Sequence, residues 1–423
     1  MQAGAVLPGK YAVQKENVVN SNSHQDEIGA PSVEDIRAGL VGQAVALRPL
    51  LRGQAARGES DRVLPVEVVD ALADAGVFRL LTPRRYGGHE TDLRTLTEVS
   101  EALGEGDGST AWVGMIIAVT NWLACLFPDK AQEEVFGADP DARVTGVAAP
   151  TGVGDRVPEG WRVNGRWSYN SGAPYATWAA VGALLKDENG AVVDQALVLV
   201  HASQLTVEDT WHTAGMRATA SNTLIAEDVF VPEHRVLSVP AAAEGVYPRE
   251  SRDETLYDST FGPMLLLCLV GPLLGLGAAA MHVAVEQAAA KPLSFTVHPR
   301  QADSVGVQMQ VAEAALKLET ARLHTYRAVD EVDRAAASGS PLDYAARARI
   351  RARAGFAAQH VLDAISTLLN VHGASSFADA GLLQRIWRDA NVAARHAGLV
   401  PAVGLEVYGK SLLGISEQVS LMV

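Results

Sequence analysis

Residues 211–232, with the sequence WHTAGMRATASNTLIAEDVFVP, hold the pattern that decides the fold. The second half of this stretch, Leu224–Val231, is rich in apolar and β-branched residues and stops at Pro232. Proline lacks the backbone N–H that a strand ladder needs, so a run of this kind that ends at a proline predicts a β-strand. The first half is dominated by small and hydroxylated residues, which are typical of turns.

Further runs of the same kind surround this strand, and Gly, Pro, Asn and Asp separate them. They are RVTGVAA (143–149), WRVNGRWSYNSG (161–172), TWAAVGALL (177–185) and QALVLV (195–200). Inside the second run, Asn164-Gly165 predicts a two-residue hairpin, because both residues tolerate the positive φ that such turns need. We therefore expect an antiparallel β-domain, a barrel or sandwich, over residues 143–250.

The regions on either side of the β-rich segment have helical periodicity. Residues 32–142 predict an N-terminal helical domain, and residues 251–423 predict a C-terminal four-helix bundle. The expected helices are Asp92–Leu103, Thr110–Phe127 with Ser109 as its N-cap, the apolar run 261–287, Asp303–Ser338, Asp343–Val371 and Leu382–Gly398. Residues 1–31 are polar and predict a flexible tail. The fold class is thus mainly α with a central β-domain.

Composition and charge exclude several classes of partner. The chain has 423 residues and a formal net charge of −14, and an acidic surface repels nucleic acid. Cys125 and Cys268 each lie in an apolar run, which predicts buried thiols, no metal site and a cytoplasmic location.

The uncharged stretch Phe261–Val285 is long enough to cross a bilayer, but Pro263 and Pro272 interrupt it. We expect this stretch to be a core helix, and we expect no membrane partner.

Several common catalytic motifs are absent from the sequence. No G-x-G-x-x-G follows a strand, and there is no P-loop, no H-E-x-x-H or other zinc-ligand spacing, and no G-x-S-x-G. The sequence therefore has no motif typical of Rossmann dehydrogenases, P-loop kinases, zinc proteases or serine hydrolases.

Five motifs, in order along the chain, carry a resemblance to a known family. They are PRRYGG (83–88), GSTAW (108–112), the pair Thr145–Pro150 and WSYNSG (167–172), the stretch 211–232 quoted above, and RDA (388–390). Together they resemble the acyl-CoA dehydrogenase superfamily over residues 35–410. Within it, the chain is most similar to two-component flavin-dependent monooxygenases, and among these to the amino-sugar N-oxygenases, or nitrososynthases. The resemblance implies the acyl-CoA dehydrogenase fold.

The resemblance also implies a flavin between the β-domain and the bundle. In such a site Ala148, Ala149 and Ser171 would line the ring, and Arg217 and Ser221 would lie beside it. Trp122 is a further candidate for contact with the cofactor. The alternative for Ser171 is a turn serine that bonds its own backbone.

The last predicted helix separates dehydrogenases from oxygenases. One group of acyl-CoA dehydrogenases places its carboxylate base where this chain has Ala397, so that base is missing. His396 stands beside it, in the region where monooxygenases of this branch carry a histidine. A histidine titrates near neutrality and transfers protons, which makes His396 a candidate catalytic residue, as is Ser171. Asp389, two helical turns earlier, is expected on the same face. His372 is a second candidate, with a helix cap as its alternative role.

Residues in the helix at 110–127 bear on the substrate. Aromatic hydroxylases of this branch tend to carry a histidine just before the pair Asn121-Trp122, and here that position is Thr120. Thr120 and Asn121 are therefore candidate substrate-binding residues. The missing histidine, together with the run Gly404–Lys410, favours an amine substrate over a phenol.

The function implied is oxygenation with reduced FMN or FAD from a separate flavin reductase, through a flavin C4a-hydroperoxide formed with O2. The expected substrate is a nucleotide-linked (dTDP) amino sugar, oxidised to a hydroxylamine or nitroso sugar in antibiotic biosynthesis. Arg322 or Arg327 would be available for its diphosphate. An aromatic or other heteroatom hydroxylase and an acyl-CoA dehydrogenase remain alternatives. The resemblance further implies a homotetramer.

Overall fold

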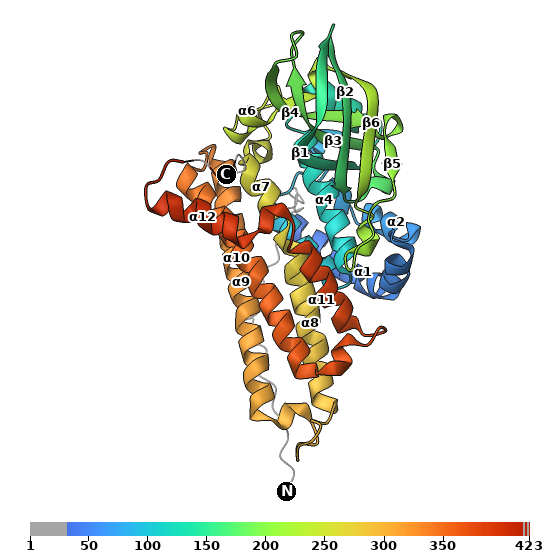
Figure 1. Cartoon of the computed structure of the whole chain (residues 1–423), viewed down its shortest axis with the longest axis vertical. Coiled ribbons are helices and arrows are strands. Elements are labelled where there is room, and N and C mark those ends of the chain that lie inside the picture. The colour runs from blue at the N-terminus through green and yellow to red at the C-terminus, as the bar shows by residue number, and fades with distance from the viewer. Residues whose placement is uncertain (1–31, 418, 421–422) are drawn as a thin grey trace, which may run out of the picture.

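The computed structural model describes residues 32–417, 419–420 and 423, so the predicted tail at 1–31 lies outside the described residues. Figure 1 shows a sheet at one end of the molecule, long helices at the other, and the N-terminal helices packed beside the junction of the two. Two hydrophobic cores correspond to this division. One joins the N-terminal helices to the bundle, and the other lies within the sheet.

Five α-helices form the N-terminal region of the described chain. They are α1 (Val33–Asp61), α2 (Val66–Asp74), α3 (Leu93–Gly104), α4 (Gly108–Ala124) and α5 (Asp129–Phe136). Three of them, α1, α3 and α4, begin at polar side-chain caps, Ser32, Asp92 and Asp107. The predicted cap of α4 is wrong, because Asp107 caps this helix and Ser109 lies inside it. The Asp107 carboxylate accepts the Thr110 backbone N–H at 2.8 Å, a stronger cap than a neutral hydroxyl provides.

The central sheet has seven strands in the order β5-β6-β2-β1-β3-β4-β7. Their bounds are β1 (Val144–Val157), β2 (Gly160–Asn170), β3 (Trp178–Lys186), β4 (Val192–His201), β5 (Thr206–Glu208), β6 (Asn222–Pro232) and β7 (Val236–Ser238). The expectation of a purely antiparallel domain is wrong at one place, where β1 and β3 pair in parallel. The chain crosses back through Ser171–Thr177 before β3, so β3 runs in the same direction as β1.

The predicted hairpin at Asn164-Gly165 is also wrong. The hairpin turn is Pro158-Glu159, where Glu159 has a φ of 65°, and β1 and β2 pair on either side of it. Asn164-Gly165 lies inside β2, at a register shift against β6. The Asn164 side chain accepts the Asp228 backbone N–H at 2.8 Å and so holds the bulge that a hairpin signal also permits.

The C-terminal half contains the predicted bundle. Its helices are α6 (Val239–Ala243), α7 (Phe261–Leu267), α8 (Val270–Ala290), α9 (Val305–Ser338), α10 (Tyr344–His372), α11 (Leu382–Ala393) and α12 (Pro401–Leu412). In Figure 1, α8, α9, α10 and α11 lie side by side as the four-helix bundle, and α12, which the sequence did not predict, crosses α10.

Two predicted bundle helices have different bounds. The apolar run from Phe261 divides into α7 and α8, which break at Cys268-Leu269. Among the described residues, Phe261–Ala290 is the one helical stretch apolar and long enough to span a membrane, and 83% of its most apolar window is buried inside the fold. The last predicted helix, 382–398, ends early, at Ala393. His396 therefore lies beyond α11, in the loop that leads to α12.

Candidate active site

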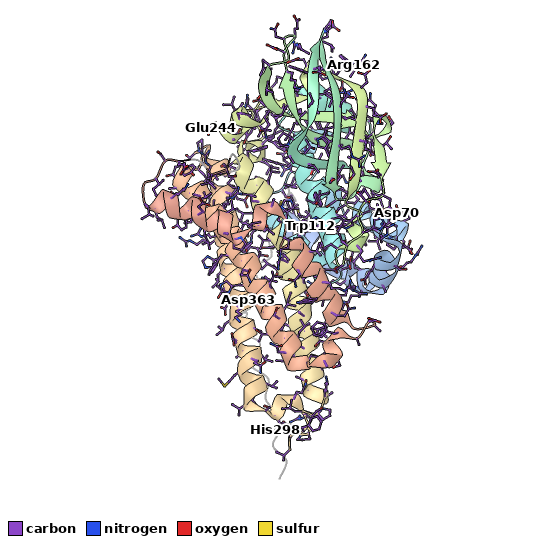
Figure 2. The ribbon with its side chains drawn as sticks, in the orientation of Figure 1. Asp70, Trp112, Arg162, Glu244, His298 and Asp363 are labelled. Atoms are coloured by element: carbon purple, nitrogen blue, oxygen red, sulfur yellow. The ribbon has the colours of Figure 1, made fainter. Side chains whose placement is uncertain are left out.

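The helix α4 forms one side of the candidate site, where it packs against β1, α8 and α11. All residues of α4 are buried except Ile116. Trp112 and Thr120 lie one helical turn before and after Ile116, on the same face. Trp112, labelled in Figure 2, lies at the junction of the sheet with the helices. We call this region the junction site, and define it by Trp112, Ile116, Ala148, Ala149, Ser171, Ser221 and His396.

The second side is a bulge in β1. Val147 pairs with Val181 and Gly152 with Ala183, so four residues of β1, 148–151, lie opposite the single residue Gly182 of β3. A ladder cannot pair all the backbone groups of such a bulge. Ala148 is half-buried and Ala149 is exposed, so the structure places both predicted residues on an open surface. Their small side chains leave room for a flat ring.

A chain of hydroxyl groups crosses the floor of the junction site. The Trp112 indole Nε1 donates to the Ser171 Oγ at 3.1 Å, and the Ser171 Oγ lies 2.8 Å from the Ser221 Oγ. The Ser221 Oγ lies 2.7 Å from the Thr219 Oγ1, which donates to the Met216 carbonyl at 2.8 Å. We call these four side chains, Trp112, Ser171, Ser221 and Thr219, the hydroxyl relay. The relay brings together the predicted Ser171 and Ser221.

The turn that carries Ser221 is fixed to the helices. The Asp389 carboxylate on α11 accepts the Met216 backbone N–H at 2.5 Å. A side chain at Gly215 would meet the Arg388 carbonyl 2.4 Å from its Cβ, so only glycine allows this close approach to α11. The Arg388 guanidinium pairs with Glu59 of α1 at 2.5 Å.

Arg217 takes part in the same attachment. Its guanidinium donates to the Glu59 carbonyl at 3.0 Å and to the Thr213 carbonyl at 3.2 Å. These bonds use two of its five N–H groups on the backbone of α1 and of the turn. Arg217 therefore helps to hold the turn, and its contact with the cofactor stays a prediction.

Two carboxyl groups are buried where the turn, α4 and α11 meet. Burial, with the neighbouring Asp107, raises the pKa of Asp389 to about 7, against the Met216 N–H and Arg388, which lower it. Burial also raises the pKa of Asp107. Asp389 is 5% exposed and faces the turn, so it does not share a helical face with His396 as predicted. The reason is that α11 ends between them.

His396 lies on the open side of the junction site, with its ring centre 5.9 Å from that of Trp112. The surrounding protein desolvates the imidazole and lowers the pKa of His396 to about 4. The side chain is nevertheless exposed to solvent on one side. Its Nδ1 accepts the Gly398 N–H at 3.1 Å, so the neutral ring carries its hydrogen on Nε2 and presents a donor.

His372 is not part of this site. The Lys291 ammonium donates to its carbonyl at 2.6 Å, and Ser375 lies 3.4 Å from its Nε2. The backbone of the same Lys291 loop bonds Gln301 and runs past His298, which Figure 2 labels at the far tip of the bundle. Burial lowers the pKa of His372, with Lys291 as the lesser cause. Of the two predicted histidines, only His396 reaches the junction site.

Three predicted residues of α4 are buried and have their polar atoms bonded within the protein, so their roles in binding stay predictions. Asn121 is fully buried, and its amide bonds Phe78 O at 2.9 Å, Ala142 O at 2.8 Å and Val144 N at 3.0 Å. Trp122 is also fully buried, and its Nε1 donates to the Leu256 carbonyl. The Thr120 hydroxyl donates back to Ile116 O at 2.7 Å, because a threonine inside a helix bonds the preceding turn.

The residues that sequence reasoning missed are Ile116, Thr219 and the indole of Trp112. Trp112 and Thr219 both lie within recognised motifs, but no pattern in the sequence shows that they meet. The one available signal is the spacing of Trp112, Ile116 and Thr120, which places them on one stripe of α4.

The composition of the junction site fits an isoalloxazine ring. Such a ring needs an apolar slot with a few fixed polar groups at its edge. Trp112, Ile116 and the β1 alanines supply apolar surface, and Ser171 and His396 supply polar atoms.

Comparison with known proteins agrees with this architecture. The N-terminal domain of acyl-CoA dehydrogenase matches residues 47–135, and the C-terminal domain of acyl-CoA dehydrogenase matches residues 267–401. The structure of XiaF from Streptomyces sp., in complex with FADH2 and glycerol, has a TM-score of 0.86 and 38% identity, and covers 92% of this chain and 98% of that one.

Two relatives with established names are similar over most of their length. The oxygenase subunit HsaA of a flavin-dependent monooxygenase from Mycobacterium tuberculosis is 33% identical, over 87% of this chain and 94% of that protein. The oxygenase component of an FADH2-dependent resorcinol hydroxylase from Rhizobium sp. is 31% identical, over 94% of this chain and 98% of that protein.

Proposed function

Because the chain belongs to the family of two-component flavin-dependent monooxygenases with the acyl-CoA dehydrogenase fold, we propose that it hydroxylates an aromatic compound at the junction site. As in its relatives, the cofactor is a reduced flavin. The balanced reaction takes an aromatic C–H, O2 and reduced flavin to an aromatic C–OH, water and oxidised flavin. Bound reduced flavin supplies the two electrons and activates the oxygen.

The residues of the junction site would bind the ring and control its surroundings. Ile116 and the β1 alanines exclude water from one side, which protects reactive species from hydrolysis. Ser171 and Ser221 hold polar edge atoms, and the neutral His396 donates a hydrogen bond from Nε2. A group that already carries this hydrogen at neutral pH serves as a donor without having to take up a proton.

An aromatic substrate is supported by the apolar surface and by one relative. The observation that carries this choice is the Trp112 ring, whose centre lies 5.9 Å from that of His396, on the same face of α4 as the half-buried Ile116. The resorcinol hydroxylase, which by its name acts on a phenol, matches nearly the whole chain.

N-oxidation of a nucleotide-linked amino sugar, the finer expectation from the sequence, has less support. Thr120 turns its hydroxyl into its own helix, and Lys410 of the run Gly404–Lys410 pairs with Glu406 and Glu417 on the surface. Arg322 pairs with Glu101 and stacks on Tyr326, so it is not free for a diphosphate. The relatives named above are monooxygenases, and they give no support to an acyl-CoA dehydrogenase.

A separate reductase is the partner of oxygenase components of this kind. We also propose that the chain forms a homotetramer through its bundle. Met309, Leu316 and Leu323 support this proposal, because they recur every seven residues on α9 and are 64–68% exposed. Apolar residues at this spacing are typical of a helix face that packs against another helix.

The test is to supply reduced FAD and 18O2 and to measure mass changes over phenols, amino sugars and acyl thioesters. A phenol that gains one labelled oxygen atom is the expected product. Labelled product from an amino sugar alone would overturn aromatic hydroxylation and restore N-oxidation. Anaerobic bleaching of oxidised flavin by an acyl thioester would indicate a dehydrogenase instead.

A further inference from the structure

In the hydroxyl relay all hydrogen bonds are donated in one direction, and the bond from Thr219 to the Met216 carbonyl shows which direction this is. The Met216 carbonyl carries no hydrogen, so the Thr219 Oγ1 donates to it across 2.8 Å. A hydroxyl group has one hydrogen to give. In the 2.7 Å contact between Thr219 and Ser221, Ser221 must therefore be the donor.

The same argument gives the donor in the remaining bonds, from Ser221 back to Trp112. The hydrogen of Ser221 is spent on Thr219, so Ser171 donates to Ser221 across 2.8 Å. Ser171 in turn accepts the Trp112 Nε1–H at 3.1 Å. Each hydroxyl hydrogen is thus used inside the protein. Because a hydroxyl oxygen has two lone pairs, Ser171 and Ser221 each keep one, and towards a ligand they act only as acceptors.

The relay is held in this direction by burial. Ser171, Ser221 and Thr219 are 6%, 4% and 1% exposed, so water does not replace a lost partner. The Met216 carbonyl also accepts the Trp211 Nε1–H at 2.8 Å and the Thr219 backbone N–H at 3.2 Å. Reversal of the chain would set the Thr219 Oγ1 and this carbonyl oxygen 2.8 Å apart with no hydrogen between them, and it would leave the Ser171 hydrogen without an acceptor in the relay, which is costly for buried groups. The ends of the relay are also tied together, because the Gly172 N–H donates to the Thr219 carbonyl at 2.9 Å.

We infer that Thr219, acting through Ser221 and Ser171, makes the junction site select reduced flavin over oxidised flavin. An oxidised isoalloxazine has one ring N–H and otherwise presents acceptors, whereas two-electron reduction adds an N–H at N5. A floor of fixed acceptors matches the form with more donors. Thr219 is then a positioning residue that never touches the cofactor. This inference rests on the proposed flavin site, and it adds a cause for the order of events, in which reduced flavin enters and oxidised flavin leaves.

The test is anaerobic titration calorimetry of the full chain with oxidised FAD and with chemically reduced FAD. In Thr219→Val the hydrogen of Ser221 loses its acceptor and becomes free to turn to a ligand. We expect the ratio of the two dissociation constants to fall roughly tenfold, mainly through tighter binding of oxidised FAD. Thr219→Ser keeps the hydroxyl and should keep the ratio.

Thr223→Val is the matched control. Thr223 is also buried in this region and bonds Thr210 at 2.8 Å and Ser168 at 3.2 Å, outside the relay. This variant removes the same hydroxyl type and should leave the ratio unchanged. A change in the ratio equal to that of Thr219→Val would overturn the inference.

A second variant covers the case in which Thr219→Val does not fold. Ser221→Ala removes the acceptor of the Ser171 hydrogen and should also lower the ratio of the dissociation constants of oxidised and reduced FAD. If both affinities fall together in these variants, the relay is only structural and the inference is wrong. If the wild-type chain binds both forms of FAD equally, the inference is wrong but the proposed flavin site stands. If the wild type binds neither form, the proposed flavin site itself fails.

Discussion

Two buried polar networks join α4 to the sheet, and they differ in their partners and surroundings. Near the end of α4, Asn121 bonds the backbone of Phe78, Ala142 and Val144 with both amide hydrogens and its oxygen, and it is 0% exposed. Near its start, the hydroxyl relay links side chains, and it begins at Trp112, whose ring lies beside the exposed His396. The first network holds the backbone, whereas the second ends next to a surface that a ligand can reach.

This difference separates groups that hold the fold from groups that bind. Burial alone does not make the distinction, because Asn121 and Ser171 are both buried. The bonded partners do: Asn121 bonds only backbone groups, which favours a structural role, and its contact with the substrate stays a prediction. The predictions that follow test this division, from the largest expected effect to the smallest.

Asn121→Ala should destabilise the protein most. It leaves the Phe78 and Ala142 carbonyls and the Val144 N–H without partners, and each such buried group costs about 1–3 kcal/mol. We expect a loss of roughly 5 kcal/mol in the free energy of unfolding, measured by urea denaturation. A loss below about 1 kcal/mol, with flavin affinity changed instead, would place Asn121 among the binding residues.

Asp389→Asn should change the pH dependence of stability. The raised pKa, about 7 against a usual 3.8, means that the folded chain holds a proton here that the unfolded chain has released. Between these two pH values the folded state binds more protons, so this group lowers the free energy of unfolding as the pH rises. The variant should gain stability relative to wild type by up to about 4 kcal/mol between about pH 4 and about pH 8.

This gain is measured as the difference between the thermal midpoints of the two proteins at each pH. Asparagine can still accept the Met216 N–H through its side-chain oxygen, so the turn should stay in place. A difference that does not vary with pH would show that Asp389 is ionised in the folded chain throughout.

Ser171→Ala should lower the affinity for flavin more than the stability of the fold, whereas Asn121→Ala should mainly lower stability. Loss of the Ser171 hydroxyl leaves the Trp112 N–H with one partner fewer, so stability should fall by only about 1 kcal/mol. Affinity for reduced FAD, measured anaerobically, should fall roughly tenfold, because a polar contact to the ring is lost. Unchanged affinity would remove Ser171 from the site.

The smallest effect is expected from pH acting on His396. With a pKa of about 4, its imidazole is neutral across the physiological range. Product yield per reduced flavin should therefore stay flat from about pH 6 to about pH 8, and His396→Gln, which keeps a side-chain N–H donor, should retain part of that yield. A break in the wild-type profile near pH 6.5 that the glutamine variant lacks would show that His396 titrates during the reaction.

The sequence predicted the fold class because helical periodicity and strand composition are local properties. Its predictions were wrong where one local sequence pattern is compatible with two different structures. Asn164-Gly165 tolerates a bulge as well as a hairpin, and the helix that begins at Leu382 ends at Ala393, five residues before the predicted end at Gly398. Ala148 and Ala149 lie in the bulge of β1, and Ser171 bonds Trp112 and Ser221, but their contact with a flavin ring stays a prediction. Thr219 was missed because its role depends on bonds to residues brought together only by folding.

The close approach of Gly215 to the Arg388 carbonyl has a consequence for the thermodynamics of binding. With no room for even a methyl group between them, the turn and α11 move as one body, and the relay keeps its geometry before any ligand arrives. A preorganised site does not spend free energy on ordering itself, so more of the contact energy appears as affinity. Gly215→Ala should loosen this contact and make the binding of FAD entropically less favourable, even though Gly215 touches no ligand.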